Sequence, residues 1–151
     1  MEIERKFKIN GLPFSPEEYP RHEIEQGYLS TDPVVRVRKS DDEYYLTYKG
    51  KGHIAREEYN LPLTKESYEH LIAKADGNII TKTRYLIPEK DGLTIELDAF
   101  HGLFEGLWLA EVEFPSLEAA EAYIPPEWFG PDVSKDSTYH NATMSRKTFD
   151  L

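Results

Sequence analysis

The chain opens with a segment in which charged side chains fall at every second position, namely Met1-Glu2-Ile3-Glu4-Arg5-Lys6-Phe7-Lys8-Ile9. Successive side chains of a β-strand point to opposite faces, so the two glutamates and Lys6 and Lys8 would share one face. The other face carries Ile3, Phe7 and Ile9, interrupted by Arg5. A single strand of this kind is commonly one whose charged face meets water. Whether its charges bind a ligand therefore has to be decided from the rest of the chain.

The same alternation recurs along the chain, and the sign of the charge is separated strand by strand. Predicted strands over 33–39, 44–49 and 80–87 carry cations on their charged faces: Arg36, Arg38, Lys49, Lys82 and Arg84. Predicted strands over 93–99 and 109–114 carry acids instead: Glu96, Asp98, Glu111 and Glu113. Solvated faces usually mix both signs, because like charges placed together repel. We therefore interpret these faces as the two walls of a binding site.

The chemistry of the two walls indicates the class of ligand. Clustered carboxylates need a cation, and clustered arginines and lysines need an anion. Hard divalent cations bind carboxylate and phosphate oxygens together, and arginine forks match the geometry of phosphate. A metal-bound polyphosphate satisfies both walls.

Composition narrows the class of protein. The 151 residues predict a single domain over 1–151. The net charge of −10 argues against a general nucleic-acid binder, which needs a basic surface. The chain has no cysteine, no signal-peptide pattern and no apolar run of about 18 residues, so we expect a cytoplasmic protein without a membrane partner. Composition gives no information on the oligomeric state.

Strands joined by turns dominate the predicted organisation. A further strand is expected over 56–61, and short helices are expected at 16–19, over 65–75 ending at Gly77, and over 117–123. Eight or so strands with few helices predict an α+β, mainly antiparallel fold: an eight-stranded closed barrel with helices outside. Its apolar faces would pack outward and its charged faces would line a wet tunnel, which inverts the usual small barrel.

These residues carry a family resemblance that covers essentially the whole chain. Glu2-Ile3-Glu4-Arg5-Lys6 matches the E-x-E-x-K signature of the CYTH superfamily, the triphosphate tunnel metalloenzymes. The later charged strands resemble the other tunnel strands in the same order. The resemblance implies an eight-stranded tunnel that binds triphosphate compounds with Mg²⁺ or Mn²⁺. The stretch from Ala99 to Leu103, before a Gly-Leu-Trp strand, is most similar to the inorganic triphosphatase branch, which cleaves tripolyphosphate to pyrophosphate and phosphate.

The resemblance and the chemistry together imply roles for individual residues. The expected ligands of two divalent ions are Glu2, Glu4, Glu96, Asp98, Glu111 and Glu113. One ion would bridge phosphate oxygens and the second would activate a water molecule. The expected phosphate-binding cations are Lys6, Lys8, Arg36, Arg38, Lys49, Lys82 and Arg84. By resemblance, Tyr28 contacts Lys82 near the leaving group, so the expected catalytic set is Lys6, Lys82 and Tyr28.

Several other residues receive a structural interpretation. Arg56 and Glu58 share a predicted strand face, and we expect them to pair with each other. The five histidines show no metal-ligand spacing, which argues against a zinc site. The stretch 136–141 fits the family pattern poorly and is assigned no chemistry.

Three alternatives to tripolyphosphate hydrolysis remain open. The substrate could be thiamine triphosphate or a nucleoside triphosphate, because the loops at the tunnel mouth would decide selectivity. A class IV adenylate cyclase would use the same acids and cations but needs a base-recognition pocket, and the sequence identifies none. A non-catalytic polyphosphate-binding module is the third alternative.

Overall fold

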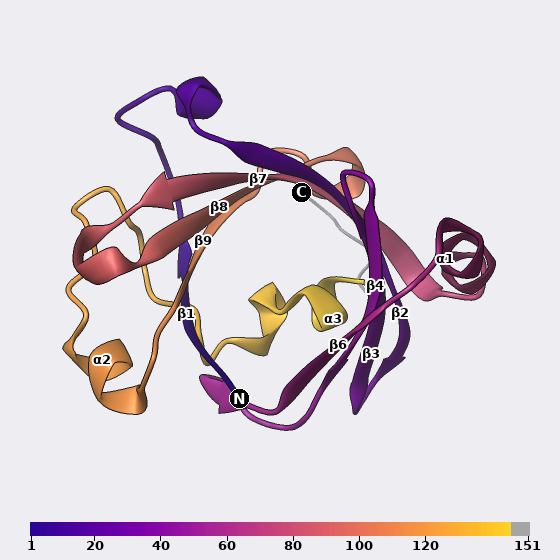
Figure 1. The fold of residues 1–151 in the computed structure, drawn as a ribbon. Helices are drawn as coiled ribbons and strands as arrows, with labels where there is room; N and C mark the ends of the chain where they lie inside the picture. The colour runs from indigo at the N-terminus through magenta and orange to yellow at the C-terminus, as the bar shows by residue number, and fades with distance from the viewer. Residues whose placement is uncertain (146–151) are drawn as a thin grey trace.

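The computed structural model describes residues 1–145, which form a barrel-like antiparallel sheet seen end-on in Figure 1. The strands follow the order β5-β1-β9-β8-β7-β2-β3-β4-β6 around the barrel. Their bounds are β1 Glu2–Lys8, β2 Arg21–Thr31, β3 Val34–Ser40, β4 Glu43–Lys49, β5 Ala55–Arg56, β6 Glu58–Pro62, β7 Asp76–Pro88, β8 Thr94–Phe100 and β9 Trp108–Glu113. The predicted fold class, a mainly antiparallel barrel with few helices, is confirmed.

The barrel closes through the segment 55–62. β5 pairs with β1, through Glu2 opposite Arg56, and β6 pairs with β4, through Lys49 opposite Glu58. Only Glu57 separates the two short strands in the sequence. The described part of the chain therefore contains nine strands at eight positions around the barrel, where the sequence predicted eight or so strands in an eight-stranded barrel.

The helices and 3₁₀ turns are short. They comprise α1 Lys65–Ile72, α2 Leu117–Ala122 and α3 Asn141–Met144, with 3₁₀ turns at Pro16–Glu18, Lys90–Gly92, Gly102–Phe104 and Ser137–Tyr139. Thr64 caps α1 by accepting a hydrogen bond from the Ser67 amide, as the sequence predicts for a capping threonine. No helix in residues 1–145 is both long enough and apolar enough to cross a bilayer.

Two predicted helix ends are wrong. α1 ends at Ile72 rather than at 75, and Gly77 lies within β7 with a φ of +70°. The end of α1 packs closely on β2, where a Cβ on Gly27 would lie 2.7 Å from Ala75 Cβ and from Ile72 Cδ1. The helix ends because the amides of Lys74 and Ala75 bond to carbonyls only three residues back, those of Leu71 and Ile72, and β7 begins at Asp76. α2 ends at Ala122, one residue before the predicted end.

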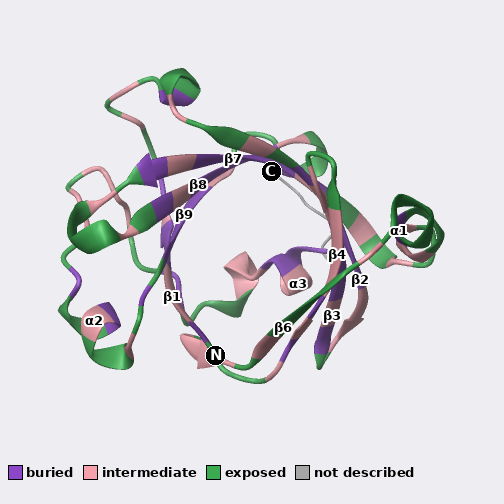
Figure 2. Cartoon of the chain, viewed as in Figure 1, coloured by how far each residue is buried: buried purple, intermediate pink, exposed green. Residues whose placement is uncertain are grey.

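The apolar faces of the strands pack outward, as predicted. Phe7, Leu97 and Val112 belong to a core between the outside of the barrel and a cover formed by α2 and the loops, to which Trp128 and Phe129 contribute. Figure 2 shows that the wall of the barrel is largely buried, whereas α1 and most turns are exposed. This arrangement leaves the charged faces to line the interior.

The C-terminal segment fills one end of the interior. Figure 1 shows α3 inside the ring of strands rather than on its outer surface. Met144 packs there in a second apolar core with Tyr28, Ile80, Phe100 and Leu109. The expectation that all helices lie outside the barrel is therefore wrong for α3. The tunnel is apolar and closed at this end, and its charged stretch begins beyond it.

Candidate active site

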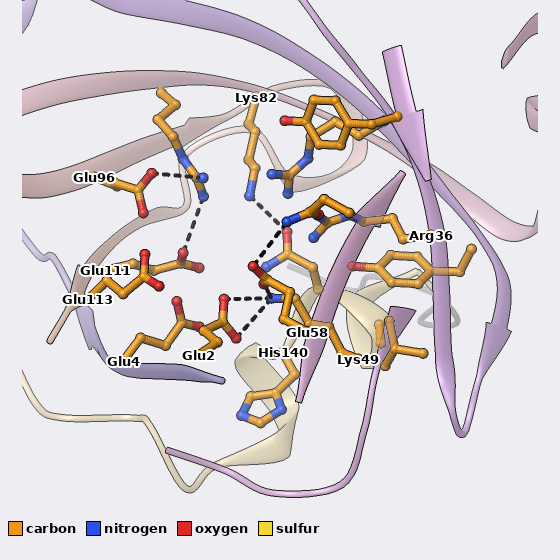
Figure 3. Close-up of a pocket in the computed structure, with 18 of the residues that line it drawn as sticks. Glu2, Glu4, Arg36, Lys49, Glu58, Lys82, Glu96, Glu111, Glu113 and His140 are labelled. Atoms are coloured by element: carbon orange, nitrogen blue, oxygen red, sulfur yellow. Dashed lines mark hydrogen bonds and ion pairs between the residues drawn. The ribbon is translucent and has the colours of Figure 1, made fainter. Parts of the chain in front are cut away.

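A single cavity of about 690 Å³ collects the charged faces of the strands (Figure 3). Its acidic lining residues are Glu2, Glu4, Asp42, Glu43, Glu58, Glu96, Glu111 and Glu113. Its basic lining residues are Lys6, Arg36, Arg38, Lys49, Arg56, Lys82 and Arg84. Tyr28 lines the same cavity. The structure thus brings together most of the predicted site, from strands spread over the first 113 residues of the chain.

The acidic wall is built by the adjacent strands β1, β9 and β8. Glu4 lies opposite Glu113 in the β1–β9 register, and Glu96 lies opposite Glu111 in the β8–β9 register. Burial raises the pKa of Glu4 to about 8, and the charges of Glu111 and Glu2 add to the effect. The pKa values of Glu2 and Glu113 are raised too, first by burial. A wall of mutually repelling carboxylates favours the arrival of a cation.

The basic wall is built by β3, β4 and β7. Burial lowers the pKa of Arg38 to about 10, and its neighbours Arg36 and Arg84 contribute by repulsion. Arg36 donates from Nη2 to Thr47 Oγ1 at 3.1 Å, and its buried Nε has no hydrogen-bond partner within residues 1–145. A buried donor without an acceptor is costly, so this nitrogen is suited to receive an anion.

Ion pairs connect the two walls. Lys6 Nζ lies 3.3 Å from Glu111 Oε1, and Arg84 Nη2 lies 3.2 Å from Glu111 Oε2. Burial alone would raise the pKa of Glu111. The charge of Lys6, and next that of Arg84, instead hold this pKa well below its usual value. On the other side of the cavity, Lys49 Nζ lies 2.9 Å from Glu2 Oε2. The acids and bases neutralise each other here. In a complex with a metal-bound anion, the metal can take the place of the basic partner of each carboxylate, and the anion can take the place of the acidic partner of each cation.

Two predicted site residues lie outside the lining of this cavity. Asp98 is buried in the barrel wall, where both of its oxygens accept hydrogen bonds from Arg84, at 2.8 and 2.9 Å. Lys8 lies toward the closed end, with its Nζ 5.7 Å from the centre of the Tyr139 ring. Metal binding by Asp98 and phosphate binding by Lys8 stay predictions.

Lys82 has different partners from the one expected. Its Nζ lies 2.8 Å from Asp98 Oδ2 and donates to Asn141 Oδ1 at 3.1 Å. Tyr28 is buried beside the same cavity, and its hydroxyl accepts a hydrogen bond from Gln26 at 3.5 Å. Within residues 1–145, hydrogen bonds through Gln26 and Asn141 connect Tyr28 to Lys82, and a direct contact between the two stays a prediction. Burial lowers the pKa of Lys82 to about 7, although the charge of Asp98 acts in the opposite direction.

Sequence reasoning missed several residues of the site. Arg56 and Glu58 do not pair with each other: Arg56 Nε lies 3.5 Å from Glu2 Oε1, and Glu58 Oε2 lies 3.3 Å from Lys49 Nζ. His140 and Asn141, in the stretch assigned no chemistry, both line the cavity. The only sequence signal for the last two was their position in the stretch 136–141, which matches the family's C-terminal segment poorly.

The donor set fits a hard divalent cation. All the acidic groups offer carboxylate oxygens, which suit Mg²⁺ and Mn²⁺. Burial raises the pKa values of Glu4 and Glu113, and the neighbouring carboxylates add a repulsion that a cation would relieve. No three acidic or histidine groups converge as a preformed metal site in the described residues. Such a wall matches a metal that keeps water and takes part of its coordination shell from substrate phosphates.

Comparison with known proteins decides the family. The CYTH domain family model matches residues 1–124, which include every strand of the barrel. The chain belongs to the CYTH family. CYTH triphosphatases are metal-dependent enzymes, in agreement with the carboxylate wall.

Individual CYTH relatives cover almost the whole chain. The inorganic triphosphatase of Nitrosomonas europaea is 40% identical over 147 residues, which are 95% of this chain and 96% of that protein. The inorganic triphosphatase of Acetivibrio thermocellus is 34% identical over 153 aligned positions, covering 98% and 95% of the two chains. The crystal structure of the inorganic triphosphatase NE1496 superposes with a TM-score of 0.72 at 37% identity, over 98% of this chain and 96% of that one.

Proposed function

We propose that this protein is an inorganic triphosphatase, a metal-dependent hydrolase that cleaves tripolyphosphate to pyrophosphate and phosphate. The observation that carries the proposal is the cavity in which a carboxylate wall faces a wall of arginines and lysines. A triphosphate with its divalent cation is complementary to both walls at once. Two relatives that span nearly the whole chain are inorganic triphosphatases, which supports this assignment over the other triphosphate chemistries.

The carboxylate wall is proposed to hold the metal. Glu2, Glu4, Glu111 and Glu113 are the principal ligands, Glu96 completes the wall on β8, and Asp98 would join only if its bonds to Arg84 opened. Two Mg²⁺ or Mn²⁺ ions are the proposed complement. A bound divalent cation supplies charge neutralisation at the phosphate oxygens and lowers the pKa of coordinated water.

The basic wall is proposed to grip the phosphate chain. Arg36 and Arg38 present buried guanidinium groups from β3, and Lys49 and Arg84 complete the wall from β4 and β7. Lys6 lies between the two walls, and Lys8 is proposed to contact phosphate at the closed end. These cations offset the charge that develops on the phosphate oxygens in the transition state.

Lys82 is proposed to be the proton-transfer group. A lysine with a pKa of about 7 can hold or release a proton at Nζ near neutral pH, which suits general acid–base work beside the scissile bond. Tyr28 is proposed to support this role from the same side of the cavity through its hydroxyl.

The remaining proposals concern the organisation and surroundings of the protein. We propose that residues 1–151 form one domain. The hydrogen bond from Lys6 Nζ to Tyr139 O supports this proposal, because it joins β1 to chain beyond the family match. Residues 146–151 lie outside the described part of the structure. A cytoplasmic location and the absence of nucleic-acid and membrane partners are also proposals.

The deciding experiment measures phosphate release from tripolyphosphate, ATP and thiamine triphosphate, each with Mg²⁺, Mn²⁺ or EDTA. We expect metal-dependent release that is fastest from tripolyphosphate. Preference for thiamine triphosphate or ATP would move the assignment to another triphosphatase, and cyclic AMP from ATP would identify a cyclase. Tight metal-dependent binding without release would identify a binding module.

A pair of variants tests the carboxylate wall in the same assay. Glu4→Gln removes a proposed metal ligand and is expected to abolish turnover. Glu57→Gln changes an exposed glutamate between β5 and β6 and is expected to leave turnover unchanged. Full metal-dependent activity in Glu4→Gln would disprove the proposed metal site.

A further inference from the structure

Asn141 brings one oxygen atom to two partners inside the tunnel. Its Oδ1 accepts a hydrogen bond from Lys82 Nζ at 3.1 Å and another from Gln26 Nε2 at 3.0 Å. Lys82 is 1% exposed, Gln26 0% and Asn141 9%, so both bonds lie away from bulk solvent. Asn141 is the first residue of α3, the helix that lies inside the ring of strands in Figure 1.

Gln26 extends this contact to the phosphate-binding wall. Its Oε1 accepts from Arg38 Nε at 2.8 Å and from Arg38 Nη2 at 2.6 Å, while its Nε2 donates to Asn141. The two ends of the Gln26 amide therefore have distinct partners, which fixes its orientation. The result is a continuous line of hydrogen bonds, Arg38 to Gln26 to Asn141 to Lys82, across β3, β2, α3 and β7.

The geometry around Lys82 shows why a second acceptor matters. An ammonium group has three N–H donors on a flexible stem. Asp98 Oδ2 at 2.8 Å and Asn141 Oδ1 at 3.1 Å are its acceptors within residues 1–145, and the Phe100 ring centre lies 5.3 Å from Nζ. Two acceptors restrict the position of Nζ and leave one N–H direction for a ligand in the cavity. Figure 3 shows Lys82 extending into this cavity.

We propose that Asn141 is a positioning residue for triphosphate hydrolysis. Its Oδ1 holds Lys82 Nζ at the reacting phosphate, and Gln26 fixes the position of Asn141 relative to Arg38. This inference rests on the proposed function. It assigns to the C-terminal segment a role in aligning the site in addition to closing one end of the tunnel. A loss of alignment is felt in the chemical step, because a shift of about 1 Å in a reacting group can cost about 100-fold in rate.

The test compares steady-state hydrolysis of tripolyphosphate by the wild type, Asn141→Ala, Asn141→Asp and Thr143→Ala. We expect Asn141→Ala to lower kcat about 10- to 100-fold and to change KM less than about threefold, because the lost bond acts on alignment rather than on ground-state binding. Thr143 lies on the same helix outside the cavity lining, and Thr143→Ala should match the wild type.

The aspartate variant separates positioning from packing. Both hydrogen bonds end on Oδ1, so a carboxylate oxygen in the same place keeps both acceptor positions. We expect Asn141→Asp to recover kcat to within about fivefold of the wild type, with a higher KM because its charge repels phosphate. If Asn141 served packing alone, a buried aspartate would be at least as damaging as alanine.

Two results would overturn the inference. One is wild-type kcat in Asn141→Ala, and the other is equal loss of kcat in the alanine and aspartate variants. Melting temperatures and limited proteolysis establish that each variant is folded, and Asn141→Leu, which keeps the volume without the acceptor, replaces an alanine variant that does not fold. An inactive wild type would refute the proposed function, whereas an active wild type with an unaffected Asn141→Ala would refute this inference alone.

Discussion

Lys82 and Asp98 form an ion pair inside the wall of the barrel, with Nζ 2.8 Å from Oδ2 and each side chain 1% exposed. Arg84 holds the same carboxylate through Nε and Nη2. One buried acid thus fixes two cations that face the cavity. The pKa of Asp98 is lowered, because the charges of Arg84 and Lys82 outweigh the effect of burial.

Removal of this carboxylate should destabilise the fold. Asp98→Ala leaves two buried cations without their partner, so the free energy of unfolding is expected to fall by about 3–5 kcal/mol. Urea denaturation measures the change. The matched control is Glu69→Gln, whose ion pair with Lys65 is 3.9 Å long and more than 60% exposed on both sides, and its loss should stay below about 1 kcal/mol. Equal losses in the two variants would contradict the prediction.

The carboxylate wall should give the metal-free protein an unusual dependence on pH. The pKa of Glu4 is about 8 in the folded protein and near 4.5 when unfolded. Between pH 4.5 and 8, Glu4 is protonated in the folded state and ionised in the unfolded state. Its contribution to the free energy of unfolding therefore decreases as pH rises. In EDTA, the decrease from pH 5 to 7.5 should be smaller in Glu4→Gln than in the wild type.

Added Mg²⁺ should oppose this loss, because the cation binds the deprotonated carboxylates. Denaturation at a series of pH values, with and without the metal, measures both effects. Glu57→Gln should keep the wild-type slope. A wild-type slope in Glu4→Gln would show that Glu4 does not titrate in this interval.

Arg36 should couple anion binding to stability. Its buried Nε lacks a hydrogen-bond partner in residues 1–145, so a phosphate oxygen that reaches it satisfies a donor that is otherwise left unpaired. Pyrophosphate should raise the melting temperature of the wild type, since a ligand that binds only the folded state stabilises it. The increase should be much smaller in Arg36→Ala and unchanged in Arg21→Ala, which alters an exposed arginine. Equal increases in all three proteins would exclude Arg36 from the anion site.

Arg38 should act mainly on substrate binding. Arg38→Ala removes a guanidinium that Gln26 orients toward the cavity, and KM for tripolyphosphate should rise about tenfold or more, with a smaller effect on kcat. Lys39→Ala, at the next position on β3 and outside the cavity lining, serves as the control. A fall in kcat with an unchanged KM would place Arg38 in the chemical step instead.

The strands that the sequence predicted best are those whose charged side chains fall at every second position. The charged residues at alternate positions are Glu2, Glu4 and Lys6 on β1, Arg36 and Arg38 on β3, and Glu111 and Glu113 on β9, and they indicate the inner face of each strand. β2 received no predicted range. Its acids Glu23 and Glu25 lie on the face opposite Gln26, and a register shift after Gln26 interrupts the alternation. In the other strands the charged face points inward, whereas in β2 the acidic face points outward. The alternation in β2 is then interrupted by the register shift.

The parts of the site that were missed depend on contacts between distant segments. Arg56 pairs with Glu2 and Glu58 with Lys49 only because the segment 55–62 joins β1 to β4. Asn141 reaches Lys82 because the C-terminal segment folds back into the barrel. Neither arrangement leaves a periodic signal in the local sequence, since each is set by the closure of the barrel rather than by a strand.

The join between β1 and β5 is the weakest seam of the sheet. It consists of two residue pairs, Glu2 with Arg56 and Ile3 with Ala55, whereas β1 and β9 share five. Local opening costs least free energy where the fewest inter-strand hydrogen bonds are broken. We therefore expect β1 and β5 to separate before the other strand pairs. Glu2 also binds Lys49 across this line, and an anion that draws Lys49 away loosens the same join. The barrel therefore contains a lateral opening site at the β1–β5 join. Fast amide hydrogen exchange at 54–56 would show that this join opens.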